Sequence, residues 1–156
     1  RRAVAYAHRY AFSYNPAYAD FTEMGGDCTN FISQCLHAGG APMNYTPTFG
    51  WFYTNLRSRA PAWSGVQPLH RFLTTNRGTG PYARPADAAE MLPGDVIQLS
   101  FNGGVNFGHS LLVVETGSPP APDNILIATH TYDSDYRPLQ SWPTGLPRYL
   151  HIEGAR

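Results

Sequence analysis

A glycine turn runs directly into an amphipathic segment in the stretch GGDCTNFISQCL, residues 25–36. The apolar residues of this segment recur every three or four positions and form one stripe along a helix: Cys28, Phe31, Ile32, Cys35 and Leu36. Gly39 and Gly40 follow, and glycine is typical of the position after a helix C-terminus. The spacing therefore predicts a helix that begins at Cys28 and buries one face against a core.

The thiol of Cys28 would then stand at a helix N-terminus. Backbone amides have no intrahelical acceptor there, and together with the helix macrodipole they favour a thiolate over a thiol. We expect the preceding residue, Asp27, to cap the helix with its carboxylate. Most free cysteines are small buried hydrophobes, so a nucleophilic role also requires a base nearby.

Later segments of the chain supply that base. An apolar run over residues 111–114 follows His109, and another over residues 125–129 ends at His130. Their composition and the Gly- and Asn-rich loops between them predict strands. If the two runs pair as an antiparallel hairpin, the start of one lies beside the end of the other. We therefore expect His109 and His130 to be neighbours.

The order of the remaining elements indicates the fold class. A stripe of Ala and Tyr over residues 3–14 predicts a first helix. The Pro-, Gly- and aromatic-rich stretch 41–89 is expected to lead through short helices near residues 50–57, 66–75 and 86–91. Strand patterns dominate after residue 91. Helices followed by an antiparallel sheet indicate one α+β domain over residues 1–156, with the Cys28 helix packed on the sheet.

Composition narrows the possible partners. The 156 residues are 42% hydrophobic and 13% aromatic, enough for one core, and the formal net charge is zero. All basic residues are arginine, and no basic cluster predicts binding to nucleic acid or to an anionic membrane. No transmembrane run or signal peptide is present, and the chain begins without Met, so we expect a mature form or an excised domain.

The two cysteines are not expected to form a disulfide. Cys28 and Cys35 lie on one predicted helix, where the rise per residue separates their Cα atoms by about 10 Å. The absence of a disulfide does not decide between a reducing and an oxidising compartment, because a secreted thiol enzyme must also keep its nucleophile unpaired.

The ordered motifs resemble a known family. The stretch Asp27–Leu36, followed by Ala38-Gly39-Gly40, resembles the signature of the bacterial putative amidase domain, a family of papain-like cysteine hydrolases. Pro93-Gly94-Asp95-Val96 and Gly108-His109-Ser110 are similar to motifs of that family and of its relatives, the NlpC-type cell-wall endopeptidases and the cysteine, histidine-dependent amidohydrolases. The resemblance extends over most of the chain, from Tyr14 to Thr131.

The resemblance implies roles for individual residues. Cys28 would attack an amide carbonyl, His109 would serve as general base and acid, and His130 would orient the imidazole of His109. Relatives place His, Asn, Asp or Glu in the orienting role, so Asp133 and Asp135 compete with His130 for it.

The resemblance also implies the fold and the substrate class. Tyr18 corresponds to a tyrosine that helps to bind the oxyanion beside the amide of the catalytic cysteine. A papain-like fold is expected, acting without a cofactor or metal on a peptide or amide bond, with peptidoglycan peptides as the leading substrate. We expect a monomer that is secreted or associated with the cell wall.

Three alternatives stay open at the level of the sequence. The domain could be a catalytically silent module that binds cell-wall or other peptides. It could be a zinc-dependent hydrolase in which Cys28, His109 and His130 hold the metal with a water. Finally, a transferase would use the same thiol chemistry with an acceptor amine in place of water.

Overall fold

The computed structural model describes the whole chain from Arg1 to Arg156, and it has the α+β architecture that the sequence predicts. The helices are α1 (Arg2–Tyr10), α2 (Cys28–Ala38), α3 (Pro61–Ser64) and α4 (Val66–Thr75). The strands are β1 (Tyr53–Asn55), β2 (Ser58–Arg59), β3 (Pro81–Ala86), β4 (Val96–Ser100), β5 (His109–Glu115), β6 (Leu126–Thr129), β7 (Ser134–Pro138) and β8 (Leu146–Ala155). None of the helices has the length and apolar character needed to span a bilayer.

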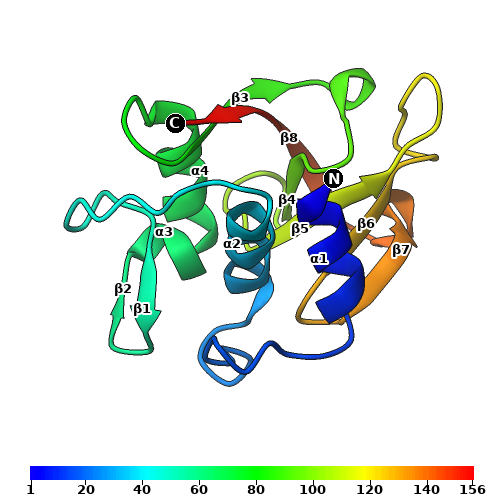
Figure 1. Ribbon diagram of the computed structural model, residues 1–156. Coiled ribbons are helices and arrows are strands. Elements are labelled where there is room, and N and C mark those ends of the chain that lie inside the picture. Colours follow the sequence, from blue (N-terminus) through cyan, green and yellow to red (C-terminus); the bar gives the residue numbers. More distant parts are fainter.

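Six strands form one antiparallel sheet in the order β3-β8-β4-β5-β6-β7. Helices α1 and α2 lie side by side in front of its centre, and α3 and α4 lie beside them with the separate β1–β2 hairpin (Figure 1). Strands β5 and β6 pair directly, as the sequence predicts, with Leu112 opposite Ala128. The start of β5 and the end of β6 therefore meet at one end of the sheet.

The sheet separates two apolar cores because side chains alternate between its faces along each strand. Even-numbered residues of β5, such as Leu112 and Val114, pack into the core under the helices together with Phe31. Odd-numbered residues, such as Leu111 and Val113, pack into the second core on the opposite face. This alternation decides which side chains at the start of β5 can meet those at the end of β6.

Several elements differ from the sequence prediction. The segment near residues 50–57 contains the strand β1 rather than a helix, and it pairs with β2. The segment near residues 86–91 is reduced to a 3₁₀ turn, Ala88–Glu90, which is held by a capping box from Asp87. Strands β3, β7 and β8 have no counterpart in the prediction.

The first helix ends at Tyr10 and not near Tyr14, and a histidine just after β6 lies against its last carbonyl. His130 Nε2 lies 2.6 Å from the Tyr10 carbonyl oxygen. The other ring nitrogen, Nδ1, lies 2.5 Å from Asp27 Oδ2. His130 therefore joins the end of α1 to the start of α2.

Asp27 occupies the N-cap position of α2, but its carboxylate does not cap the helix. It is fully buried and accepts hydrogen bonds from the Phe21 amide at 2.8 Å and from Asn30 Nδ2 at 2.9 Å, besides its contact with His130. The expected cap is thus replaced by a buried ion pair, because a long-range partner competes for the carboxylate.

The protonation of His130 follows from its two partners. Both ring nitrogens face oxygen acceptors, so both donate and the ring is an imidazolium. Burial lowers the pKa of His130, but the hydrogen bonds to Asp27 and to the Tyr10 carbonyl raise it more, and the net shift is upward. The ring also stacks on Phe31, with the centroids 4.0 Å apart.

We predict that His130→Ala destabilises the fold by about 3–5 kcal/mol, because it leaves the Asp27 carboxylate buried without a counter-charge. The pKa of His130 is higher in the folded state than in the unfolded state, so its contribution is complete below the unfolded pKa and is lost as pH rises through the folded pKa. Urea unfolding of wild type and variant across this pH range measures both effects.

His8→Ala is the matched control, because His8 pairs with Asp135 at 2.8 Å and 30% of its side chain is exposed. Its loss should cost about 1 kcal/mol or less. Equal losses for the two variants, or a His130→Ala loss that does not change with pH, would contradict the buried ion pair.

Candidate active site

Cys28 is the first residue of α2 and is only 6% exposed. Thr29 Oγ1 lies 3.8 Å from the sulfur and 2.9 Å from the hydroxyl of Ser110. Because Ser110 directly follows His109 in β5, these contacts seat the thiol against the first residues of that strand. The start of α2 and the start of β5 thus meet where the sequence places its two candidate groups.

The thiol is not activated in the way that the helix N-terminus alone predicts. Burial raises the pKa of Cys28, and the hydrogen bonds from Ser110 and Thr29 lower it only in part, while the adjacent Asp27 carboxylate raises it further. The expected thiolate is therefore replaced by a neutral thiol near pH 7. The second cysteine, Cys35, is also free and completely buried, and burial raises its pKa well above the usual range.

His109 opens β5 and is 4% exposed. Its Nε2 lies 3.4 Å from the hydroxyl of Thr129, the last residue of β6, and its ring centroid lies 4.8 Å from that of Trp142. Burial lowers the pKa of His109 to about 4, and the nearby positive charge of Arg137 lowers it as well. The imidazole is consequently neutral at pH 7 and able to accept a proton.

The structure gives His130 different neighbours from those expected. No hydrogen bond or ring contact joins its imidazole to that of His109, and its partners are Asp27 and Tyr10. The cause is the alternation along β6, which turns Thr129 toward His109 and His130 toward the helices. The β5–β6 hairpin is as predicted, but the side chains of the consecutive residues Thr129 and His130 lie on opposite faces of the sheet.

The two aspartates that competed with His130 do not contact His109 either. Asp135 pairs with His8, whose Nδ1 lies 2.8 Å from Asp135 Oδ2, and the same histidine stacks on Tyr136. Asp133 makes no hydrogen bond or ion pair within 4 Å. Thr129 is thus the residue in contact with His109 that the sequence interpretation missed, since a lone threonine at a strand end carries no distinctive signal.

Tyr18 packs among aromatic rings near the start of α2. Its ring lies 5.1 Å from that of Tyr53 and stacks on Trp63 at 5.9 Å. The indole of Trp63 in turn donates to Asn30 Oδ1, one turn into α2. The Tyr18 hydroxyl makes no hydrogen bond within the chain, and burial raises its pKa.

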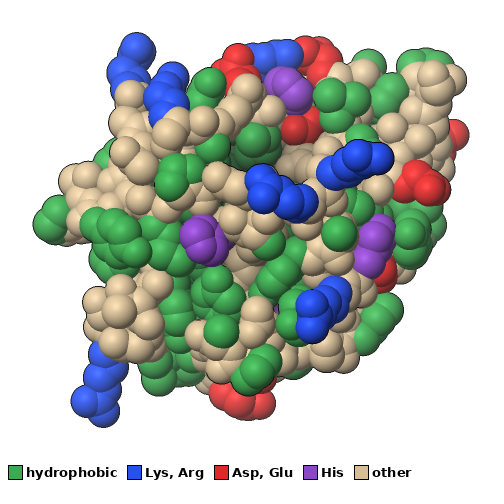
Figure 2. Space-filling view, in the orientation of Figure 1, with side chains coloured by type: hydrophobic (Ala, Val, Ile, Leu, Met, Phe, Trp, Pro, Cys, Tyr) green, Lys and Arg blue, Asp and Glu red, His purple; other side chains and the backbone are tan.

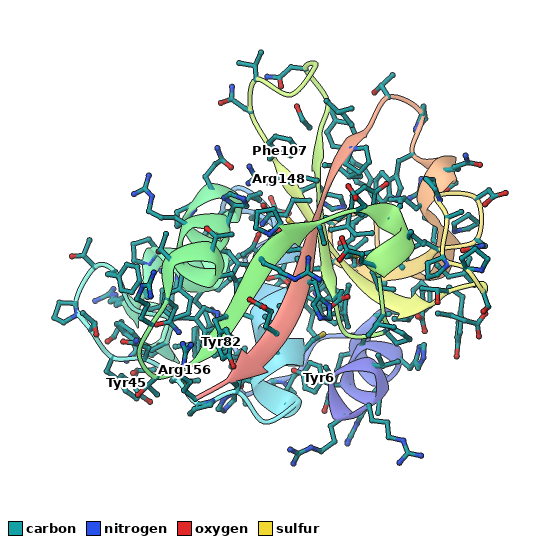
Figure 3. All side chains as sticks on the ribbon, turned by 90° about the horizontal axis from the view of Figure 1, so that it is seen from above. Tyr6, Tyr45, Tyr82, Phe107, Arg148 and Arg156 are labelled. Carbon is teal, nitrogen blue, oxygen red and sulfur yellow. The ribbon has the colours of Figure 1, made fainter.

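A buried polar chain extends from Cys28 through the sheet. The hydroxyls of Thr29 and Ser110 lie 2.9 Å apart, and Gln98 Nε2 lies 3.3 Å from Ser110 Oγ. The other end of the Gln98 amide accepts from Arg148, whose guanidinium lies 3.9 Å from the Phe107 ring centroid (Figure 3). This chain fixes the Ser110 segment against which the thiol rests.

The distribution of charge and of metal ligands is also visible in the structure. On the face shown in Figure 2 the basic side chains are distributed over the surface rather than gathered in one patch, and the basic group at the top lies between acidic ones. No three His, Cys, Asp or Glu side chains come together as metal ligands. The zinc alternative required Cys28, His109 and His130 at one point, and His130 instead points toward α1 and α2.

Comparisons with known proteins agree with the motifs of the chain. Residues 1–149 match the family model described as putative amidase domain. The chain is also 38% identical over 137 residues to the uncharacterized protein YhbB of Bacillus subtilis (strain 168).

That alignment covers 86% of this chain and 42% of YhbB, so the chain spans less than half the length of this relative. No solved structure matches. Because the family model covers nearly the whole chain, the protein belongs to the putative amidase domain family.

Proposed function

We propose that the domain is a cysteine hydrolase that cleaves an amide or peptide bond through a thioester on Cys28. One observation carries this proposal: at the start of α2 the Thr29 hydroxyl lies 3.8 Å from the Cys28 sulfur and 2.9 Å from the hydroxyl of Ser110, the residue that follows His109. A nucleophile and a neutral imidazole therefore open two adjoining elements. The family name, putative amidase domain, supports the same reaction class.

The neutral state of both groups defines the first step. As the sulfur of Cys28 attacks the carbonyl carbon, His109 accepts the thiol proton and a C–S bond forms. His109 then donates this proton to the leaving amine as the C–N bond breaks, which leaves a thioester. Water attacks the thioester carbonyl, and His109 takes a proton from the water and returns it to the sulfur as the acid departs.

Donors at the start of α2 would stabilise the oxyanion in both halves of the reaction. The amide of Cys28 belongs to the first helical turn, whose N–H groups have no intrahelical acceptor. Tyr18 is the proposed second donor, and its hydroxyl proton is not used by any other hydrogen bond in the chain.

Thr129 takes the orienting role in this mechanism. Its hydroxyl lies 2.9 Å from the carbonyl oxygen of Ser110 and 2.9 Å from that of His130, so its single proton is donated to a carbonyl. Toward His109 the hydroxyl can then only accept, which holds the proton of the imidazole on Nε2. Nδ1 is left with a free lone pair and serves as the base.

The substrate that we propose is a peptide, with bacterial cell-wall peptides as the leading class, as the resemblance to cell-wall endopeptidases implies. The alternative, a silent peptide-binding module, is favoured by one observation: Cys28 and His109 are 6% and 4% exposed. Incubation with purified peptidoglycan separates the two, because only a hydrolase releases new amine termini, whereas a binding module co-sediments with the wall and leaves it intact.

We predict that iodoacetamide modifies Cys28 at least tenfold faster than Cys35. Cys28 retains a small exposed area, whereas Cys35 has none and its pKa is raised further. Peptide mapping by mass spectrometry across pH measures both rates, and the Cys28 rate should still increase above pH 8.5 because its pKa is raised. Cys28→Ser is the control, since it removes the modified site and the turnover while keeping a similar volume.

The pH profile of kcat/KM should lack the usual histidine limb. Because the pKa of His109 is lowered to about 4, the imidazole is already an effective base at pH 5, and the acid limb should fall near pH 4 to 5. Activity is measured only over the range in which circular dichroism shows the folded chain. A limb near pH 6.5 would contradict a buried neutral base.

Substitution of Thr129 should affect the base without removing it. Thr129→Val keeps the shape but loses the acceptor, and we expect kcat to fall by about 10- to 100-fold, whereas Thr129→Ser retains most of it. The ¹⁵N shifts of the His109 ring report the tautomer directly. Wild-type and Thr129→Ser protein should show the proton on Nε2, and an unchanged tautomer in Thr129→Val would contradict the orienting role.

A further inference from the structure

A cavity of about 340 Å³ lies beside His109 and has no role in the mechanism above. Its lining is Phe101, Tyr132, Arg137, Trp142 and Pro143. The residues come from the loop after β4, from the turn before β7, from β7 itself and from the segment after it. The cavity thus combines aromatic and proline surfaces with one guanidinium.

The walls of this cavity pack against the proposed base. The Trp142 ring lies 4.8 Å from the His109 ring, and the Phe101 ring lies 6.4 Å from it. On the other side, Tyr132 follows Thr131, whose hydroxyl accepts a hydrogen bond from the Asp27 amide at 2.9 Å. A group in the cavity would therefore lie next to the base, and one lining residue, Tyr132, directly follows the residue that contacts the Asp27 amide.

Arg137 gives the cavity a positive charge that no carboxylate of the chain neutralises. Its guanidinium donates to the Ser141 hydroxyl at 2.7 Å and forms no salt bridge within 4 Å, whereas Arg84 pairs with Glu90 at 2.7 Å. It also lies flat over Trp142, with Cζ 3.7 Å from the ring centroid. The cation is thus held in place by neutral groups at the cavity wall.

Trp142 carries a second unused group. Its indole Nε1 is the single buried side-chain polar atom of the chain without a hydrogen-bond partner, although the residue is 92% buried. Buried donors are seldom left without an acceptor, and an unpaired one calls for a specific reason. The donor has almost no accessible surface and lies in the second core, so Trp142 offers the cavity its ring and not this N–H group.

The backbone around the cavity is strained in the way that binding sites often are. Thr131, Tyr132 and Tyr136 have φ values of 59°, 66° and 52°, a region that residues with a side chain seldom adopt. Tyr132 is at the same time 75% exposed. The Tyr132 ring therefore lies at the cavity rim although little of it is buried there.

From these observations we propose that the cavity is a substrate subsite that binds an amino-acid unit carrying a free carboxylate and an apolar side chain, adjacent to the scissile amide. The carboxylate pairs with Arg137, and the apolar part packs between Phe101, Pro143 and Trp142. This inference rests on the proposed function, because it names the substrate class of the same site. A bound carboxylate would also offset the positive charge of Arg137, which lowers the pKa of His109.

Binding is tested with Cys28→Ser protein, which cannot turn the probe over. The probes are N-acetylphenylalanine and its uncharged amide, titrated while the indole N–H resonance of Trp142 is followed by NMR. We expect the carboxylate to bind at least tenfold more tightly than the amide and to shift the Trp142 resonance. Arg137→Gln should abolish this preference, while Arg57→Gln, an exposed arginine whose side chain has no hydrogen-bond partner, should leave it unchanged.

Other outcomes would overturn the subsite. Equal binding of the two probes, or inorganic phosphate binding as tightly as N-acetylphenylalanine, would show that no apolar carboxylate is selected. Trp142→Leu removes the ring on which the Arg137 guanidinium rests, and it should weaken the carboxylate probe severalfold while the thermal midpoint reports folding.

The same measurements distinguish this proposal from the hydrolase. If the protein binds the carboxylate probe selectively but hydrolyses no amide, the subsite proposal is retained and the hydrolase proposal is refuted. Hydrolysis that is indifferent both to a substrate carboxylate and to Arg137→Gln would do the reverse.

Discussion

The buried pair of Asp27 and His130 is the constraint on which the rest of the structure depends. It joins the last carbonyl of α1, the first residue before α2 and the end of β6, three points that are far apart in the sequence. Burying two charges is costly, and they are retained here with every donor and acceptor engaged. Because the pair fixes the start of α2 against the sheet, it also fixes where Cys28 meets β5.

At the end of β6, two consecutive residues have different roles, one in the packing of the fold and one in the proposed active site. His130 faces the helices and holds the layers together, while its neighbour Thr129 faces His109 from the other side of the strand. Consecutive side chains on a strand necessarily point apart, so one histidine cannot serve both the ion pair and the base. A neutral hydroxyl next to the base accepts a hydrogen bond from its N–H without adding a negative charge, which agrees with the low pKa of His109.

Local patterns in the sequence predicted the elements that carry the site, and long-range contacts decided the rest. The stripe that starts at Cys28 gave the bounds of α2 correctly, and the apolar runs gave β5, β6 and their pairing. Strands β3 and β8 were missed because prolines and polar residues interrupt their alternation. The partner of Asp27 and the raised pKa of Cys28 depend on burial and on residues 103 positions away, which no local pattern contains.

Burial acts on both proposed catalytic groups in the same direction, because each loses its charged form on leaving water. The thiolate of Cys28 and the imidazolium of His109 are therefore both disfavoured at rest, and Arg137 disfavours the second further. Charge separation in such a site must be supported by something that arrives with the substrate. In the subsite that we propose, a substrate carboxylate on Arg137 would offset the smaller of the two contributions that lower the pKa of His109, the larger being burial. In this proposal one arginine, Arg137, would link recognition of the substrate to proton transfer from the thiol.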